Sequence, residues 1–165
     1  MRKQLQTHST RELFVLFGSV LTELRERGIM RSTNNPIADY AEFLFEKALR
    51  LKRAPRSTTG YDATDKAGLK YEIKGRRITT HNGSRQLSSI RGLEKRHFHY
   101  LGGVLFNEDF SVRKACLIPH KQVQEHAAYV SHTNSWKFML RDSVWTLPGV
   151  KDVTKKLQVA EKTHG

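Results

Sequence analysis

Helical spacing of apolar residues predicts two amphipathic helices at the start of the chain. A capping box of Ser9 and Glu12 begins the first helix, and Gly28 ends it. The face that this helix would bury consists of Leu13, Phe17, Val20 and Leu24. A second helix is predicted over residues 36–51, because Asn35 can cap it and Pro36 suits its first turn. Its apolar face consists of Ile37, Ala41, Leu44, Ala48 and Leu51. Each helix therefore has one face suited to a core.

Alternation of apolar and polar residues then predicts a hairpin of two strands, at residues 61–65 and 69–75. A long polar and basic segment follows over residues 76–99. After it, the stretches "LGGVLF" and "VRKACLI" predict another pair of strands, which the turn "NEDFS" joins. The middle of the chain is therefore expected to form a sheet.

The last third of the chain is predicted to mix helices and strands. A short helix is expected after Pro119, and a terminal helix over residues 152–160 is capped by Asp152. Between them, "WKFML" and "SVWTL" have the pattern of strands. The order of all these elements predicts an α/β fold without internal repeats.

The length and composition favour a single domain. A chain of 165 residues with 38% hydrophobic residues can bury one core. We therefore expect one domain over residues 1–165, with flexible ends at residues 1–8 and 160–165. The single cysteine, Cys116, excludes an internal disulfide and lies in the apolar stretch "ACLI". A buried strand thiol is the expected state of this residue.

The net charge points to a polyanionic partner. The formal charge is +13 and the pI is about 10.1, so nucleic acid is the first candidate and an anionic membrane surface the second. The longest apolar run, at residues 13–17, is far too short to span a bilayer, and the N-terminus lacks the layout of a signal peptide. No membrane association and a cytoplasmic location are therefore expected.

Two carboxylates and a lysine come together in the segment "YDATDKAGLKYEIKGRR" at residues 61–77. In a β-strand, Glu72 and Lys74 point to one face, and Tyr71 and Ile73 point to the other. A three-residue loop that ends in Gly68 would pair Ala63 with Tyr71 and Asp62 with Glu72. This register gathers the apolar side chains on one face and the carboxylates on the other, whereas a one-residue slip mixes the two faces.

Facing carboxylates repel each other, so the pair Asp62 and Glu72 favours a cation between them. A small set of oxygen ligands suits Mg²⁺, with Mn²⁺ as a substitute. Lys74 would lie beside the metal, where an attacking water and a charged phosphate could be held. These residue types therefore predict metal-assisted hydrolysis of phosphodiesters. The alternative is that these residues form a solvated, salt-bridged strand face without a catalytic role.

The motif "GYD" followed by "YEIK" resembles the core of the PD-(D/E)XK nuclease superfamily, in which Tyr61 takes the place of the proline. The resemblance covers most of residues 36–127, and within the superfamily the chain is similar to a bacterial and phage group of small stand-alone proteins. It implies a restriction-endonuclease-like core, a central mixed β-sheet flanked by helices. It also implies a bacterial or phage origin and DNA as the substrate.

The same resemblance implies a role for each site residue. Asp62 and Glu72 would bind the metal with the carbonyl of Ile73, and Glu42 would bind it through water or hold a second ion. Lys74 would position or activate the attacking water. Because two nearby carboxylates raise the pKa of an amine, we expect Lys74 to act by orientation and charge stabilisation rather than as a base.

The basic segment after the hairpin is a candidate nucleic-acid contact, because it directly follows the Glu-x-Lys strand. Its candidate residues are Arg76, Arg77, Arg85, Gln86, Arg91, Lys95 and Arg96. An ordinary solvated loop could have the same composition.

The sequence therefore predicts an Mg²⁺-dependent DNA endonuclease with Asp62, Glu72, Lys74 and Glu42 as its catalytic residues. Two alternatives stay open. One is a nucleic-acid-binding or regulatory module of the same fold that cuts nothing, and the other is a nuclease directed at RNA. A homodimer is a further expectation, because a double-strand cut needs two sites, and it rests on analogy with restriction enzymes.

Overall fold

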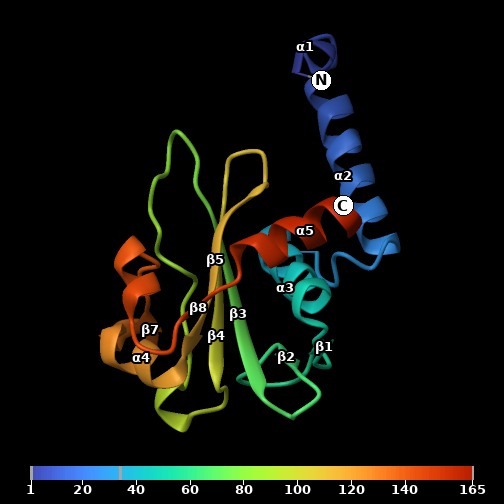
Figure 1. Ribbon diagram of the computed structural model, residues 1–165. Helices are drawn as coiled ribbons and strands as arrows, with labels where there is room; N and C mark the ends of the chain where they lie inside the picture. The colour runs from blue at the N-terminus through green and yellow to red at the C-terminus, as the bar shows by residue number, and fades with distance from the viewer. Residues whose placement is uncertain (1, 34, 165) are drawn as a thin grey trace.

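A mixed β-sheet forms the centre of the computed structural model, which describes residues 2–33 and 35–164 (Figure 1). The strand order is β1-β2-β3-β4-β5-β8, and only β3 and β4 pair in parallel. The strands are β1 (Lys52–Arg53), β2 (Ala63–Thr64), β3 (Lys70–Arg77), β4 (Tyr100–Phe106), β5 (Val112–Pro119) and β8 (Lys151–Asp152). The expected α/β class with a central mixed sheet is confirmed.

Helices cover both faces of this sheet (Figure 1). The α-helices are α1 (Arg2–Leu5), α2 (Thr10–Glu26), α3 (Pro36–Leu49), α4 (His120–His126) and α5 (Thr154–His164). Short 3₁₀ helices are η1 (Leu93–Lys95), η2 (Ser131–Thr133) and η3 (Asp142–Thr146), and a second small sheet pairs β6 (Ala128–Val130) with β7 (Ser135–Lys137). Helices α3 and α5 pack on one face, whereas α4 and the small sheet lie on the other.

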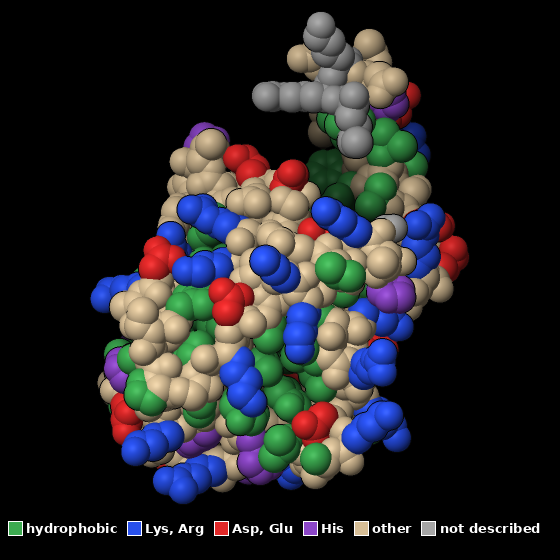
Figure 2. Space-filling view, in the orientation of Figure 1, with side chains coloured by type: hydrophobic (Ala, Val, Ile, Leu, Met, Phe, Trp, Pro, Cys, Tyr) green, Lys and Arg blue, Asp and Glu red, His purple; other side chains and the backbone are tan. Residues whose placement is uncertain are grey.

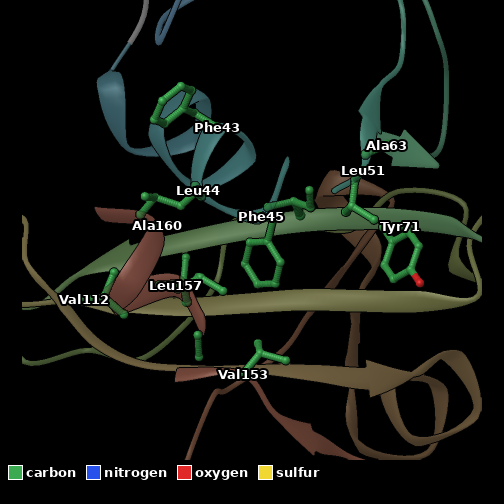
Figure 3. Packing of buried hydrophobic residues seen from close by; sticks show 14 of the residues in the cluster. Phe43, Leu44, Phe45, Leu51, Ala63, Tyr71, Val112, Val153, Leu157 and Ala160 are labelled. Carbon is green, nitrogen blue, oxygen red and sulfur yellow. The ribbon is translucent and has the colours of Figure 1, made fainter. Parts of the chain in front are cut away.

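Helix α3 lies close to the sheet, because its large Phe45 side chain packs against a glycine of β4. The Asn35 side chain accepts a hydrogen bond from the amide of Ile37 and begins the helix, as expected. Phe45 is fully buried between α3 and the strands (Figure 3). A Cβ at Gly102 of β4 would lie 2.9 Å from the Phe45 ring, so only glycine lets the helix approach this closely.

The second face of the sheet buries the only cysteine. Cys116 of β5 is fully buried among Leu101, Leu140 and their neighbours. Burial raises the pKa of its thiol to about 12. The expectation of a buried strand thiol is confirmed.

The C-terminal part differs from the expectation at "SVWTL", at both ends of the terminal helix, which begins at Thr154, and in the unexpected strands β6 and β8. The stretch "SVWTL" belongs to η3 rather than to a strand, because its Val144 turns into the core and Trp145 packs over the Lys114 ammonium at 4.1 Å. The terminal helix continues to His164, and Ala160 within it is 4% exposed. Residues 160–164, expected to be a flexible end, belong to this helix, while residue 165 lies outside the described part. The other expected flexible end, at residues 1–8, contains the short helix α1.

Helix α2 forms as predicted but does not join the core. Its capping box is present, with the Ser9 amide 2.7 Å from the Glu12 carboxylate. None of its residues is buried, although Leu24 packs partly against the core beside α3. The helix projects from the body of the molecule (Figure 1) and carries hydrophobic side chains on its surface (Figure 2). No helix in the described residues is long and apolar enough to cross a membrane.

Candidate active site

The hairpin that carries the candidate site has the predicted register. Ala63 pairs with Tyr71, and Thr64 pairs with Lys70. The loop ends at Gly68, whose φ of +80° lies in the left-handed region that glycine adopts without strain. The Asp65 carboxylate holds this loop by accepting the amides of Ala67 and Leu69, each at 2.9 Å. The three-residue loop is therefore confirmed.

The regular pairing ends before it reaches Asp62. The amide of Asp62 donates to the carbonyl of Tyr71 at 2.8 Å, and its Oδ2 accepts the amide of Ile73 at 2.6 Å. The predicted register paired Asp62 with Glu72. In the structure the two residues are not ladder partners. The Asp62 carboxylate instead lies against the backbone of β3, directly beside the residue after Glu72.

The early end of β2 opens one edge of β3. Strand β2 pairs with β3 only at Lys70 and Tyr71, while β4 pairs along β3 from Tyr71 to its end. From Glu72 onward the outer edge of β3 has no strand neighbour in the described residues. Glu72 and Lys74 therefore lie on a part of β3 whose outer edge no other strand of the described residues covers, and the Asp62 carboxylate accepts the Ile73 amide of this edge.

Glu72 and Lys74 form a close ion pair along this strand. The Lys74 Nζ lies 2.6 Å from the Glu72 Oε1, and the side chains of Lys74 and Glu72 are 17% and 13% exposed, respectively. Burial disfavours the charged lysine, but the carboxylates of Glu72 and Asp62 outweigh burial, so the pKa of Lys74 lies above its ordinary value. This direction confirms the expectation from the sequence and keeps the ammonium charged at neutral pH.

Asp62 is the most perturbed carboxylate of the candidate site. Burial and then the nearby charge of Glu72 raise its pKa to about 7, against the opposing influence of Lys74 and of the Ile73 amide. A buried carboxylate in this position is costly to ionise in the metal-free protein. A cation that binds between Asp62 and Glu72 would remove that cost, so the pair fits a metal ligand set.

Glu42 reaches the candidate site from helix α3. It lines a small polar cavity of about 140 Å³ together with Asp62, Tyr61 and Arg31. Its Oε2 lies 2.6 Å from an amino group of Arg31. Burial raises the pKa of Glu42, while Arg31 opposes that shift. The structure therefore brings Glu42 to the same cavity as Asp62, as the resemblance implied.

Arg31 is a site residue that the sequence-based prediction missed. It ties Glu42 to the carbonyl of Ala54, to which it donates at 2.9 Å, and so links α3 to the segment that leads to Asp62. Its Nε is buried without a hydrogen-bond partner in the described residues. The one signal for it in the sequence is weak, a basic residue in the polar connector "RSTNNP" that precedes α3.

The carboxylates do not form a complete metal cage by themselves. In the described residues, no group of three or more His, Cys, Asp or Glu side chains could hold a metal ion as arranged. Glu72 and Glu42 instead pair with Lys74 and Arg31. The donor set of Asp62, Glu72 and the Ile73 carbonyl consists of oxygen atoms only, which suits Mg²⁺ when water and phosphate supply the other ligands.

The candidate nucleic-acid residues fall into two groups. Toward the end of β3 and in the loop after it, several are engaged within the protein. Arg76 donates to the carbonyl of Ser84, Arg77 donates to that of Glu108, and Arg85 forms an ion pair with Asp142 at 2.7 Å. The neighbouring Gln86 is paired through its backbone to Met139. The side chains of the three arginines are therefore less free to bind a nucleic acid than the sequence suggested, whereas the backbone pairing of Gln86 does not engage its side chain.

The second group consists of Arg91, Lys95 and Arg96, which are exposed and form no ion pair in the described part of the chain. We call these three residues the basic turn. It lies close to the candidate site, because a Cβ at Gly60 would be only 2.4 Å from the side chain of His97. Gly60 precedes Asp62 by two residues, so the segment that carries His97 packs against the loop that leads to Asp62.

The comparisons with known proteins add no relative. No protein-family model matches this chain, and no curated protein matches it.

Proposed function

We propose that this protein is an Mg²⁺-dependent endonuclease that hydrolyses DNA phosphodiester bonds at a site of the PD-(D/E)XK type. The observation that carries the proposal is the ion pair of Lys74 and Glu72 beside Asp62, whose pKa is raised to about 7. A carboxylate so costly to ionise, at an open strand edge, is typical of a functional site rather than of a solvated strand face.

The roles of the residues follow from their positions. Asp62 and Glu72, with the carbonyl of Ile73, would hold the metal ion. When bound, Mg²⁺ would neutralise charge on the phosphate and lower the pKa of a water molecule. Lys74 keeps its proton and places a positive charge where the phosphate gains negative charge, so it stabilises the transition state rather than accepting a proton. Arg31 fixes the orientation of Glu42 at the same cavity.

The charge distribution supports a nucleic-acid substrate. The chain carries a formal charge of +13, and Lys and Arg side chains are spread over the face in Figure 2. Arg96 of the basic turn directly precedes His97, which packs against Gly60 in the loop that leads to Asp62. A phosphate backbone held by these cations could pass the open edge of β3.

The test is a cleavage assay with the metal as the variable. Purified protein is incubated with supercoiled plasmid, linear duplex and single-stranded DNA in Mg²⁺, in Mn²⁺ and in chelator. We expect the wild type to cut in either metal and not in chelator. The double variant Asp62→Ala/Glu72→Ala should lose both cleavage and the heat of Mg²⁺ binding in calorimetry. The variant Glu125→Gln, which changes an exposed carboxylate on α4, should retain both.

Three outcomes would contradict the proposal. Binding of DNA without cleavage in either metal would favour the non-cleaving module. Cleavage of single-stranded or duplex RNA alone, in a parallel assay, would favour the RNA-directed nuclease. Cleavage that persists in the double variant would place the active site elsewhere in the chain.

A further inference from the structure

Helix α2 carries a broad apolar surface that no other element covers in the part of the chain that the structure describes. Its Phe14 and Phe17 side chains are 71% and 57% exposed. The exposed members of this surface are Leu13, Phe14, Val15, Leu16, Phe17 and Val20. The side chains of Leu13, Phe14, Phe17 and Val20 lie within about 120° of one another around the helix and form one apolar face, whereas Val15 lies on the opposite side.

An apolar groove lies at the other end of the same helix. It has a volume of about 480 Å³ and separates the C-terminal half of α2 from the body of the protein. Phe17, Val20 and Leu24 of α2 line one side, and the other side includes Ile29, Tyr40 and Phe110. Figure 2 shows the hollow beside the projecting helix. The N-terminal half of α2, which we call the tip, is thus apolar and exposed. The groove beside its C-terminal half is suited to bind the tip of a second copy.

The spacing of the apolar residues suits a pair of antiparallel helices. Leu13, Phe17, Val20 and Leu24 follow one another at intervals of four, three and four residues, which is the seam of a coiled coil. A two-fold axis that passes between residues 18 and 19 would place Leu13 opposite Leu24 of a second copy. The same axis would place Phe17 opposite Val20. Leu13 lies about 17 Å along the helix from Leu24, so the tip of each helix reaches the groove of the other.

The charge of α2 argues against the other partners of a basic protein. The helix has two arginines, Arg11 and Arg25, against three glutamates, Glu12, Glu23 and Glu26, in a chain of net charge +13. A helix that binds an anionic membrane or a nucleic acid carries a basic polar face. The polar residues of α2 have the opposite bias, so its apolar face fits another protein surface.

We propose that this surface joins two copies of the chain into a homodimer, with the α2 helices antiparallel and each helix tip in the partner's groove. Such an isologous contact uses the tip and the groove of both copies at once. A stable interface buries roughly 800 Å² per partner, so the dimer has to bury the helix tip and the groove of each copy together. The proposed dimer does not depend on the proposed nuclease activity, because it is tested by measuring the molecular mass of the protein and not DNA cleavage.

The test is the mass of the protein in solution, by light scattering after gel filtration and by sedimentation velocity. We expect the wild type at tens of micromolar to have about twice the 19.0 kDa mass of the chain. The variant Phe14→Glu/Phe17→Glu should be monomeric, with its dissociation constant raised at least about 100-fold. Both side chains are exposed, so the variant should fold, and circular dichroism checks this. The control is Val159→Glu, which places one glutamate at a 61% exposed apolar position on α5 and should stay dimeric.

Cysteine pairs test the antiparallel arrangement. Cys116 is buried, so introduced thiols can be followed alone. The variant Leu13→Cys/Leu24→Cys should form a disulfide-linked dimer on oxidation, because the two positions are too far apart to close within one helix. Leu13→Cys alone should not, and a rapid dimer from this single variant would show a parallel pair and overturn the arrangement.

Two further results would overturn the proposal as a whole. One is a wild type that stays monomeric at 100 µM, including one that instead sediments with phosphatidylglycerol vesicles through Phe14 and Phe17. The other is a dimer that persists in Phe14→Glu/Phe17→Glu.

Discussion

The Lys74 ammonium lies 2.6 Å from the Glu72 carboxylate on the same face of strand β3, opposite the buried Ile73. Two residues of spacing on a strand suffice for this contact, because side chains at i and i+2 point the same way. The pair links the group proposed to stabilise charge with a group proposed to hold metal. A mutation of Lys74 therefore tests charge stabilisation separately from metal binding by Glu72.

Replacing Lys74 by methionine should remove catalysis while leaving metal binding. We expect the cleavage rate to fall at least about 100-fold, because a positive charge positioned for the transition state is lost. Glu72 and Asp62 remain, so calorimetry should still detect Mg²⁺. The matched control is Lys70→Met on the same strand face, where Lys70 lies over the Tyr61 ring, and its rate should change less than about threefold. Equal losses in the two variants would show that Lys74 has no special role.

Replacing Asp62 by asparagine should stabilise the protein in the absence of metal. Burial and the charge of Glu72 raise the pKa of Asp62 to about 7, so ionising it costs folding free energy. We expect the variant to gain roughly 1–3 kcal/mol in chelator at pH 8, since asparagine can still accept the Ile73 amide. Thermal unfolding of both proteins in chelator measures the difference.

The pH dependence of that difference has a defined sign. Because the folded protein holds the Asp62 proton more tightly than the unfolded chain does, the stability that Asp62 gives the wild type falls as the pH rises from about 4 to about 7. The advantage of Asp62→Asn should therefore grow over this range and then level off. If Asp62→Asn is less stable than the wild type at pH 8, ionising the Asp62 carboxylate does not cost folding free energy, and the prediction is wrong.

The sequence predicted the centre of the candidate site better than its surroundings. The hairpin register followed from local rules, since only one alignment separates apolar from charged side chains, and the structure has that register at Ala63 and Tyr71. The position of Asp62 beyond the last pair did not follow, because it depends on the hydrogen bond that its carboxylate accepts from the Ile73 amide. The ion pair of Arg31 and Glu42 joins a loop to a helix, and no pattern in the sequence specifies such a contact.

The fold shows the same limit at helix α2 and at residues 142–146. The apolar periodicity of α2 predicted its helix correctly, but periodicity cannot tell whether an apolar face meets the core of its own chain or another molecule. The stretch "SVWTL" has the composition of a strand, yet it forms η3 because tertiary contacts of Val144 and Trp145 outweigh a weak propensity.

The basic turn should carry part of the DNA affinity. Neutralising Arg91, Lys95 and Arg96 with glutamine should weaken binding and lower the slope of log K against log salt by about two to three, near 0.9 for each phosphate that the protein no longer neutralises. Fluorescence anisotropy at several salt concentrations measures this slope. A control with equal loss of charge, Arg113, Lys155 and Lys156 to glutamine on β5 and α5, should change the slope by less than about one. Equal slopes in the two variants would mean that net charge alone binds DNA.

The close approach of α3 to the sheet gives a prediction about stability and the candidate site together. A Cβ at Gly102 would lie 2.9 Å from the ring of Phe45, nearer than such atoms come, so Gly102→Ala must displace a fully buried side chain. We expect a loss of about 1–3 kcal/mol, as for other overpacked cores, measured by urea unfolding. Gly83→Ala is the control, because a Cβ there meets nothing within 4 Å and restricting the unfolded chain should leave stability equal or slightly higher.

A second substitution distinguishes overpacking from a general defect of β4. If the ring of Phe45 is the obstacle, Phe45→Leu should cost less in the Gly102→Ala background than in the wild type, a coupling of about 0.5–3 kcal/mol. Phe45 lies three residues after Glu42 on α3, so a displaced helix should also move the carboxylate that contacts Arg31. Cleavage by Gly102→Ala should then fall below that of Gly83→Ala under conditions in which both proteins are fully folded. Additive losses from Gly102→Ala and Phe45→Leu would instead place the effect of the alanine in the strand itself.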